Sequence, residues 1–582
     1  MTETLEQPRG RSLRLPAALP ASARLRDAQA LAAIGVAAAL AGGIALGIRI
    51  AMDVRGKPLF EDEAVAGLIS ARPFGELMHT VWWERGGPPL HFVLAHIALW
   101  LDPSAFALRW LSVVFALAAV PLAWDLGRRL GGHVAAGATA VAVAASSLLV
   151  VYGSFARMYA LYVFAATLAV DLFVRAVRLR TGRAAFAAAL AAWLLPAVHP
   201  YGIFLVAAEA LVGLALWRGR PLRPALPVAA VALALTPFVI ADLRLASRFS
   251  VGLDGETRVA NPGDAWSQVW RAFQASAGGH GWTLILALVL AGTGLAVLAA
   301  RREFVLPALL VISASLPPLL LLLARTSSAP GLSPRHLAYV VPLVAGLIGV
   351  GTAWAVSRLG PPGAAVALAA LTAALLISPV GGIRDPRDWL NDVLGGGPGS
   401  VALGSQLNLG SPKDWLEREV GPGSVIFPYS AVYLSALPAT RHASALPYAQ
   451  RATVLRAFDR VDMPVPNLFV SVPVGPSPLE WRRFRGLLGK EFTPVRFGPW
   501  LLIEGHGPYR DERDVLLAMY TALAAARDTT LEPRRDELGW YYKTTLSVLC
   551  GSLRTFGEHC PPPSLTWLQP AGPPSKLPRL GD

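Results

Sequence analysis

Three acidic residues stand together near the start of the chain, in the segment Phe60-Glu61-Asp62-Glu63-Ala64. A carboxylate held in a fixed place can accept a proton from a reacting hydroxyl or bind a divalent cation. Asp and Glu also favour the first turn of a helix, so the same residues could simply cap a helix that follows. The residue types alone do not choose between these roles, nor between Asp62 and Glu63 as a base.

Two arginines stand where an apolar run begins: Arg157 in the segment 154–161 and Arg335 in the segment 333–337. An arginine in such a position can extend to the phosphates of lipid headgroups. It can equally hold a phosphate ligand, because the guanidinium group offers two parallel hydrogen bonds. His336, next to Arg335, also suits an anion.

Two further polar segments interrupt the apolar sequence. The first runs from Trp82 to His91 and contains Pro88-Pro89, which favours a rigid turn before a helix. The second is His199-Pro200-Tyr201-Gly202. Aromatic residues at a membrane interface often serve only as anchors, and a lone histidine is usually structural.

The elements that must position these residues are membrane helices. The chain has 582 residues, of which 54% are hydrophobic and 15% charged, and its mean hydropathy is +0.48. Soluble proteins carry about 25% charged residues, so a soluble, disordered or collagen-like chain is excluded. Eleven apolar runs approach the length of about 20 residues that a span needs: 28–48, 106–126, 134–152, 155–174, 184–198, 201–217, 225–241, 282–300, 304–324, 337–356 and 364–379.

The arginines set the orientation of these spans. With the N-terminus inside, the short inside loops hold twelve arginines and the short outside loops three. The positive-inside rule therefore predicts residues 1–28 as a cytoplasmic tail and residues after 380 as extracytoplasmic. A net charge of +14 would otherwise indicate nucleic acid as a partner, but the topology accounts for it. The same topology brings all the motifs above to the outer face.

Two long outside loops and a C-terminal region complete the predicted organisation. The first loop covers 51–105, with surface helices expected at 63–78 and 88–101, and the second covers about 242–281. Residues 385–510 are predicted to form a small α/β domain, and residues 511–582 a helix at 512–527 and a proline-rich tail. Strands are expected at 425–427, 468–472 and 500–503, and helices at 414–419 and 479–488.

Cys550 and Cys560 are the only cysteines. Two cysteines at this spacing exclude a disulfide framework and a zinc site. They could form one disulfide if this region lies outside the cytoplasm, and otherwise they are two unpaired thiols.

The order and content of the motifs resemble the GT-C membrane glycosyltransferases, close to the protein-mannosyltransferase and aminoarabinose-transferase group (family 39 and its relatives). The resemblance covers about residues 30–380. It implies a transfer of mannose or a similar sugar from a polyprenyl-phosphate carrier to an acceptor hydroxyl at the outer face of the plasma membrane, with inversion. The motifs that carry it are Asp62-Glu63-Ala64, Pro88-Pro89-Leu90, Ala156-Arg157-Met158-Tyr159-Ala160-Leu161, His199-Pro200-Tyr201-Gly202 and Arg335-His336-Leu337.

The resemblance also implies roles for single residues. Asp62 matches the acid that activates the acceptor, with Glu63 beside it, and a divalent metal could assist. The acceptor, whether protein, lipid or glycan, is not implied. Phe155 stands where many relatives carry an acidic residue. The remaining candidates are Arg157, Arg335, His336 and His199 for the donor phosphate, and Tyr159, His91 and Tyr201 for positioning the substrate.

Two other functions fit a polytopic chain. A transporter or lipid flippase would place ionisable residues near the middle of the bilayer, where the sequence offers only Asp171 and Glu209. A non-catalytic envelope assembly protein is the other alternative, and Phe155 and the appended domain favour it.

Overall fold

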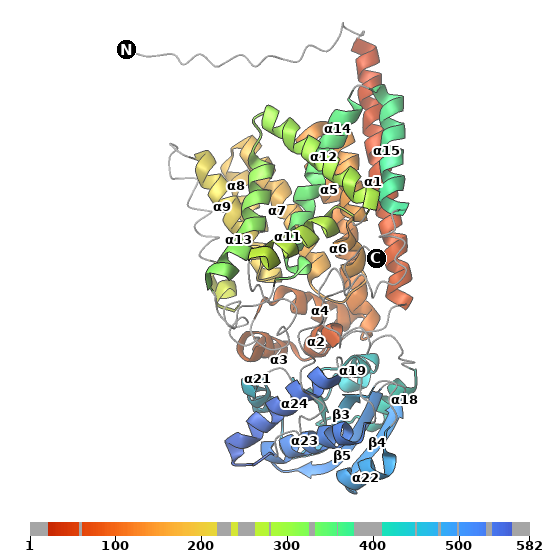
Figure 1. Ribbon diagram of the computed structural model, residues 1–582, viewed down its shortest axis with the longest axis vertical. Coiled ribbons are helices and arrows are strands. Elements are labelled where there is room, and N and C mark those ends of the chain that lie inside the picture. Colours follow the sequence, from red (N-terminus) through yellow and green to blue (C-terminus); the bar gives the residue numbers. More distant parts are fainter. Residues whose placement is uncertain are drawn as a thin grey trace, which may run out of the picture.

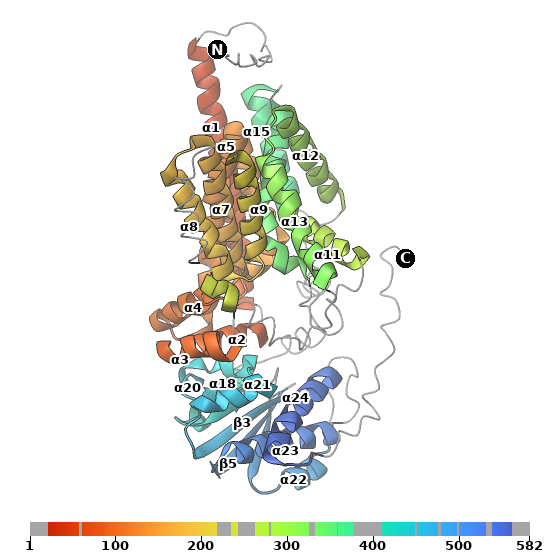
Figure 2. The ribbon, with the colours of Figure 1, turned by 90° about the vertical axis from the view of Figure 1, so that its left-hand side faces the viewer.

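The computed structural model consists of a long helical bundle with a small mixed sheet at one end (Figure 1). The start of the first helix and the sheet lie at opposite ends of the molecule. Three short helices, α2 to α4, lie between bundle and sheet in both views (Figures 1 and 2). The structure describes residues 21–56, 61–85, 87–217, 234, 236–241, 262–278, 281–324, 332–357, 359–377, 410–447, 451–474, 479–497, 500–530 and 538–560.

The bundle confirms the predicted polytopic helical fold. In the described part of the chain, five helices are long and apolar enough to cross a membrane, and five shorter helices are also apolar. The predicted run 225–241 lies mostly outside the described residues. The bundle helices are α1 (Ala21–Gly56), α5 (Ala105–Ala145), α6 (Ser147–Tyr152), α7 (Tyr159–Leu179), α8 (Gly182–Val198), α9 (Gly202–Trp217), α12 (Gly281–Ala300), α13 (Val305–Ala324), α14 (Val341–Val356) and α15 (Gly360–Ile377).

Helix α5 contains two helices joined by a tight reversal. Gly131 and Gly132 leave helical geometry, and Gly132 has a φ of 81°, which favours glycine. A Cβ on Gly127 would lie only 2.5 Å from an atom beyond the reversal, so glycine allows the two halves to approach closely. The two halves correspond to the separate spans predicted at 106–126 and 134–152.

The first loop is helical but broken. It contains α2 (Glu61–Ser70), α3 (Phe74–His79), a π-helix η1 (Thr80–Arg85) and α4 (Leu90–Leu101). The predicted single helix at 63–78 is interrupted because Pro73 takes an extended ψ of 143° before α3. In the second loop, α11 (Pro262–Ser276) is described, and a 3₁₀ helix η2 (Pro334–Val340) leads into α14.

The C-terminal domain, defined here as residues 410–560, is built on a five-stranded sheet in the order β2-β1-β3-β5-β4. β1 runs parallel to β2 and β3, whereas β5 runs antiparallel to β3 and β4. The predicted strands correspond to β1, β3 and β5, while β2 and β4 were not expected. The strands are β1 (Val425–Phe427), β2 (Ser444–Ala445), β3 (Val465–Pro473), β4 (Phe492–Phe497) and β5 (Trp500–Tyr509).

The helices of this domain extend its core past residue 510. Val515 and Leu523 of α23 and Leu549 of α24 belong to one buried apolar cluster with Val470 of β3 and Ile503 of β5. The helix predicted at 512–527 corresponds to α23. The helices are α18 (Gly410–Glu419), α19 (Ala431–Ser435), α20 (Leu437–Thr440), α21 (Arg451–Ala457), η3 (Phe458–Arg460), α22 (Trp481–Leu488), α23 (Glu512–Thr529), α24 (Leu538–Leu553) and η4 (Arg554–Phe556).

Candidate active site

Four separate stretches of sequence meet where the bundle faces the first loop. They are the start of α2, the turn between α6 and α7, the corner between α8 and α9, and η2. The contacts described below join eight residues singled out from the sequence, which are Asp62, Glu63, Arg157, Tyr159, His199, Tyr201, Arg335 and His336.

Glu63 is fully buried and held by three hydrogen bonds. Arg109 donates from Nε and from Nη2 to its two carboxylate oxygens, each at 2.8 Å. The backbone N–H of Ala156 donates to Oε1 at 2.9 Å. A carboxylate that is engaged through both oxygens in this way is suited to holding the α6–α7 turn beside α2.

Asp62 lies in a different environment. Its side chain is 45% exposed, and Oδ2 lies 3.7 Å from Nη1 of Arg335. Its carbonyl oxygen accepts a hydrogen bond from Nη1 of Arg157 at 3.1 Å. Asp62 therefore presents an accessible carboxylate beside Arg335, with Arg157 on its backbone carbonyl oxygen, and a base that takes a proton from a substrate must be accessible in this way.

The turn that carries Arg157 is fixed by polar contacts from α5 and α2. The hydroxyl of Ser112 donates to the carbonyl oxygen of Phe155 at 2.7 Å, and Ala156 is tied to Glu63. Phe155 contributes its ring to the apolar core of the bundle, against Tyr152. The Nε atom of Arg157 is buried and makes no hydrogen bond within the described part of the chain.

Arg335 is presented by η2, whose first turn is capped by Ser333 and His336. The guanidinium carbon of Arg335 lies 5.9 Å from the centre of the Tyr159 ring, within the range of a cation–π contact. Its Nε atom, like that of Arg157, is buried without a hydrogen-bond partner among the residues described. Buried donors are normally satisfied, and a bound anion is one group that can satisfy them.

The histidines and tyrosines stack beside these arginines. His199 lies parallel to Tyr162, with ring centres 4.7 Å apart, and His336 lies parallel to Tyr201 at 4.8 Å. The two imidazoles are 5.6 Å apart. Tyr159 approaches His199 at 5.7 Å, so the five rings form one aromatic wall.

The hydrogen bonds define which nitrogen of His199 carries the proton. The backbone N–H of Tyr201 donates to Nδ1 of His199 at 3.2 Å, which leaves the proton on Nε2. Burial, and then the positive charges of His336, Arg335 and Arg157, hold the pKa of His199 well below its ordinary value. These surroundings favour the neutral form of His199, whose Nε2–H can donate a hydrogen bond.

Arg109 is a residue that sequence reasoning missed. It is 2% exposed and also donates to the carbonyl oxygen of Val54 at 3.1 Å. The available signal was an arginine inside the apolar run 106–126, since a buried arginine needs an acidic partner. Only the fold shows that this partner is Glu63.

Three further predicted residues take no part in the contacts described above. His91 is buried at the start of α4, where its ring meets that of Phe92, and its part in positioning substrate stays a prediction. In the C-terminal domain, Cys550 and Cys560 are not joined in the structure, and Sγ of Cys560 lies 3.5 Å from the Cys550 carbonyl oxygen. Their pairing also stays a prediction.

A metal site receives no ligand set from the described residues. Within them, no group of three or more His, Cys, Asp or Glu side chains could hold a metal ion.

At the end of the bundle away from the site, Asp171 is paired with Arg129 at 2.8 Å. Glu209 on α9 is buried, and its Oε1 has no hydrogen-bond partner among the residues described.

Comparison with solved structures identifies the fold. ArnT from Cupriavidus metallidurans in the apo state has a TM-score of 0.53 at 12% identity, over 81% of this chain and 97% of that chain. The same protein bound to undecaprenyl phosphate also has a TM-score of 0.53 at 12% identity, over 84% of this chain and 100% of that chain. The chain has the GT-C fold. No protein-family model matches the sequence, and the search of curated proteins found no match.

A more distant GT-C structure scores lower. The archaeal oligosaccharyltransferase AglB from Archaeoglobus fulgidus, in complex with an inhibitory peptide and a dolichol-phosphate, has a TM-score of 0.43 at 12% identity, over 76% of this chain and 69% of that chain. The two ArnT structures confirm the fold predicted from the motifs.

Proposed function

We propose that the protein is an integral membrane glycosyltransferase that moves a sugar from a polyprenyl-phosphate carrier to an acceptor hydroxyl. The observation that carries this proposal is the exposed carboxylate of Asp62 beside Arg157 and Arg335, each of which has a buried, unsatisfied Nε–H in the described structure. A phosphate group can accept from such donors. The presence of undecaprenyl phosphate in an ArnT structure of the same fold supports this ligand.

The proposed reaction is a single displacement. The acceptor hydroxyl gives its proton to Asp62 while its oxygen forms a bond to the anomeric carbon. The bond from that carbon to the phosphate oxygen breaks, its configuration inverts, and polyprenyl phosphate leaves with the electron pair. Arg157, Arg335 and Nε2–H of His199 would stabilise the charge that develops on the phosphate. A base in the place of Asp62 contributes about 10²–10⁴-fold to such a rate.

The two neighbouring acids receive different roles in this proposal. Asp62 is the base because its carboxylate is accessible. Glu63 is a positioning residue, since Arg109 and the Ala156 N–H occupy its oxygens. The aromatic wall would hold the donor against the arginines, with Tyr159 and Tyr201 closest to it.

The direction of transfer follows from the proposed topology. The arginine distribution supports a cytoplasmic N-terminus in the plasma membrane, with the site and the C-terminal domain on the outer side. Mannose or a similar sugar is the proposed cargo. Since a divalent cation could assist, turnover should be compared with and without a chelator.

The test uses purified protein in lipid and labelled polyprenyl-phosphate mannose, glucose, galactose and arabinose, with a membrane extract as acceptor. Loss of carrier-linked sugar is measured for the wild type, Asp62→Asn and Asp102→Asn. Asp102 is an exposed acid of the same loop that binds only Ser104 in the contacts described, so it is a matched control. Turnover of one donor that is lost only in Asp62→Asn supports the proposal. Equal turnover in Asp62→Asn, or none with any donor, contradicts it.

A further inference from the structure

Helix α2 presents Asp62 at one end and touches the C-terminal domain along the rest of its length. Gly67 lies directly against Leu434 of α19: a Cβ on this glycine would be 2.3 Å from the Leu434 Cδ1 atom. Ala64 and Leu68 share one buried apolar cluster with Leu434 and with Ile426 of β1. The helix has ten residues and spans about 15 Å, so the active-site end and the docking surface belong to one rigid rod.

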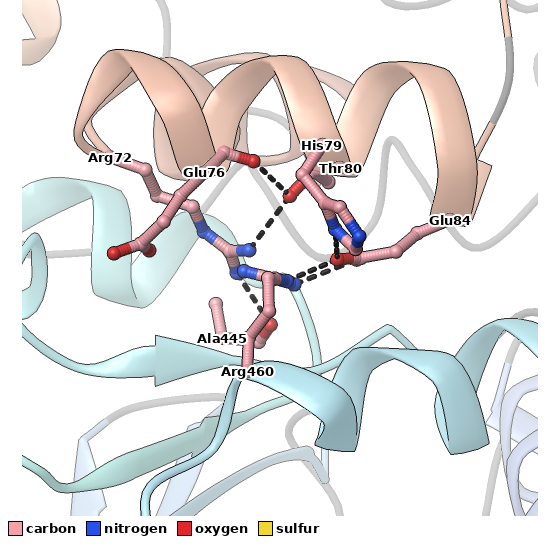
Figure 3. Close-up of polar contacts among 7 residues, drawn as sticks. All are labelled: Arg72, Glu76, His79, Thr80, Glu84, Ala445 and Arg460. Carbon is pink, nitrogen blue, oxygen red and sulfur yellow. Dashed lines mark hydrogen bonds and ion pairs between the residues drawn. The ribbon is translucent and has the colours of Figure 1, made fainter.

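A buried arginine ties the end of α2 to the sheet (Figure 3). Arg72 is 3% exposed and stands two residues after the end of α2. It donates from Nη2 to the carbonyl oxygen of Ala445 in β2 at 2.7 Å, and from Nη1 to Oγ1 of Thr80 at 3.1 Å. The same side chain thus binds the C-terminal domain and the π-helix η1.

An ion pair completes the contact four residues further along η1. Glu84 is 1% exposed, and both its oxygens accept hydrogen bonds from Arg460 of the C-terminal domain (Figure 3). The ring of His79 also lies 3.3 Å from Oε1 of Glu84. A pair with a buried carboxylate and two hydrogen bonds has few alternative arrangements, so it sets the position of the domain on the loop.

We infer that Arg460 is a positioning residue: its pair with Glu84 docks the C-terminal domain on the first loop, and the docked domain holds α2 so that Asp62 faces Arg157 and Arg335. The inference rests on the proposed function, since it assigns Arg460 a part in that reaction. Loss of the pair releases the outer side of α2, while the donor-binding arginines stay on the bundle. Because small misplacements of a catalytic group can cost about 10²-fold, we expect the rate to fall while donor binding persists.

The test compares Arg460→Ala and Arg460→Lys with Arg513→Ala. Arg513 pairs with Glu558 within the same domain, on an exposed surface, so its removal breaks an ion pair without touching the loop. Two quantities are measured on full-length protein in lipid. The first is hydrogen–deuterium exchange of α2, which needs no substrate, and the second is kcat beside the Kd for polyprenyl phosphate.

We expect Arg460→Ala to raise exchange in α2 but not in α7 or α14, and to lower kcat about 10- to 100-fold with Kd within threefold of wild type. Arg460→Lys keeps the positive charge but cannot form the two parallel hydrogen bonds. Its exchange in α2 and its kcat should therefore lie between those of Arg460→Ala and the wild type. Unchanged exchange in α2, or equal losses of kcat and donor affinity, would overturn the inference. If the wild type turns over no donor, the proposed function fails. The hydrogen–deuterium exchange of α2 in Arg460→Ala then decides by itself whether Arg460 positions α2.

Discussion

The buried pair of Glu63 and Arg109 offers a quantitative test of how the site is held. The two side chains are 0% and 2% exposed and share two hydrogen bonds of 2.8 Å. Arg109→Met removes the cation that binds both oxygens of Glu63 and leaves the carboxylate buried without that cation. Breaking a buried pair on one side costs about 3–5 kcal/mol, so we expect the free energy of unfolding to fall by that amount.

The double variant Glu63→Leu/Arg109→Met separates a lost pair from a damaged core. It removes both charges, leaves one unsatisfied N–H at Ala156, and should recover at least about 2 kcal/mol of the loss in the single variant. Unfolding is followed in mixed micelles of increasing denaturing detergent. Arg128→Met is the control, because its exposed pair with Asp125 contributes about 0–1 kcal/mol. A loss below about 1 kcal/mol for Arg109→Met would refute this account of the site.

Three further predictions concern the proposed donor site and the C-terminal domain. Arg335→Gln should weaken binding of polyprenyl phosphate about 10- to 100-fold, since hydrogen bonds to charged groups contribute about 1.5–3 kcal/mol; unchanged affinity would remove Arg335 from the phosphate site. Because the folded protein holds the pKa of His199 well below 6.5, the unfolded chain binds the extra proton, and stability should fall as the pH drops below 6.5. His199→Gln should therefore flatten the decline of the unfolding midpoint between pH 7 and pH 5, and an equally steep decline would contradict the assignment. A membrane-impermeant maleimide should label Cys550 and Cys560 in intact cells only after reduction, and labelling before reduction would contradict the disulfide.

The positions of the bundle helices along the sequence were largely predictable, because a run of apolar residues and a glycine turn are both local features of the sequence. The reversal at Gly131 and Gly132 separates two runs that the sequence already divided, and the positions of most helices follow the apolar runs. The first loop was harder. Pro73 divides one predicted helix into two, and the π-helix at Thr80–Arg85 has no sequence signal of its own.

The partners of charged residues could not be predicted, because they depend on tertiary contacts between distant segments. Glu63 and Asp62 are neighbouring acidic residues, yet Glu63 is buried against Arg109 whereas the carboxylate of Asp62 stays accessible. Likewise, nothing in the sequence around Glu84 indicates that it forms an ion pair with Arg460 of the C-terminal domain. The residue types predicted an anion site, and only the fold shows that Arg157 and Arg335 both contact Asp62.

The central claim is that Asp62 removes a proton from the acceptor during sugar transfer. The direct measurement is a single-turnover rate with the donor already bound, for the wild type and for Asp62→Asn in the same lipid preparation, together with the Kd for the donor. The account predicts a rate about 10²–10⁴-fold lower in Asp62→Asn with the Kd within about threefold of wild type. Equal rates at saturating donor would contradict it.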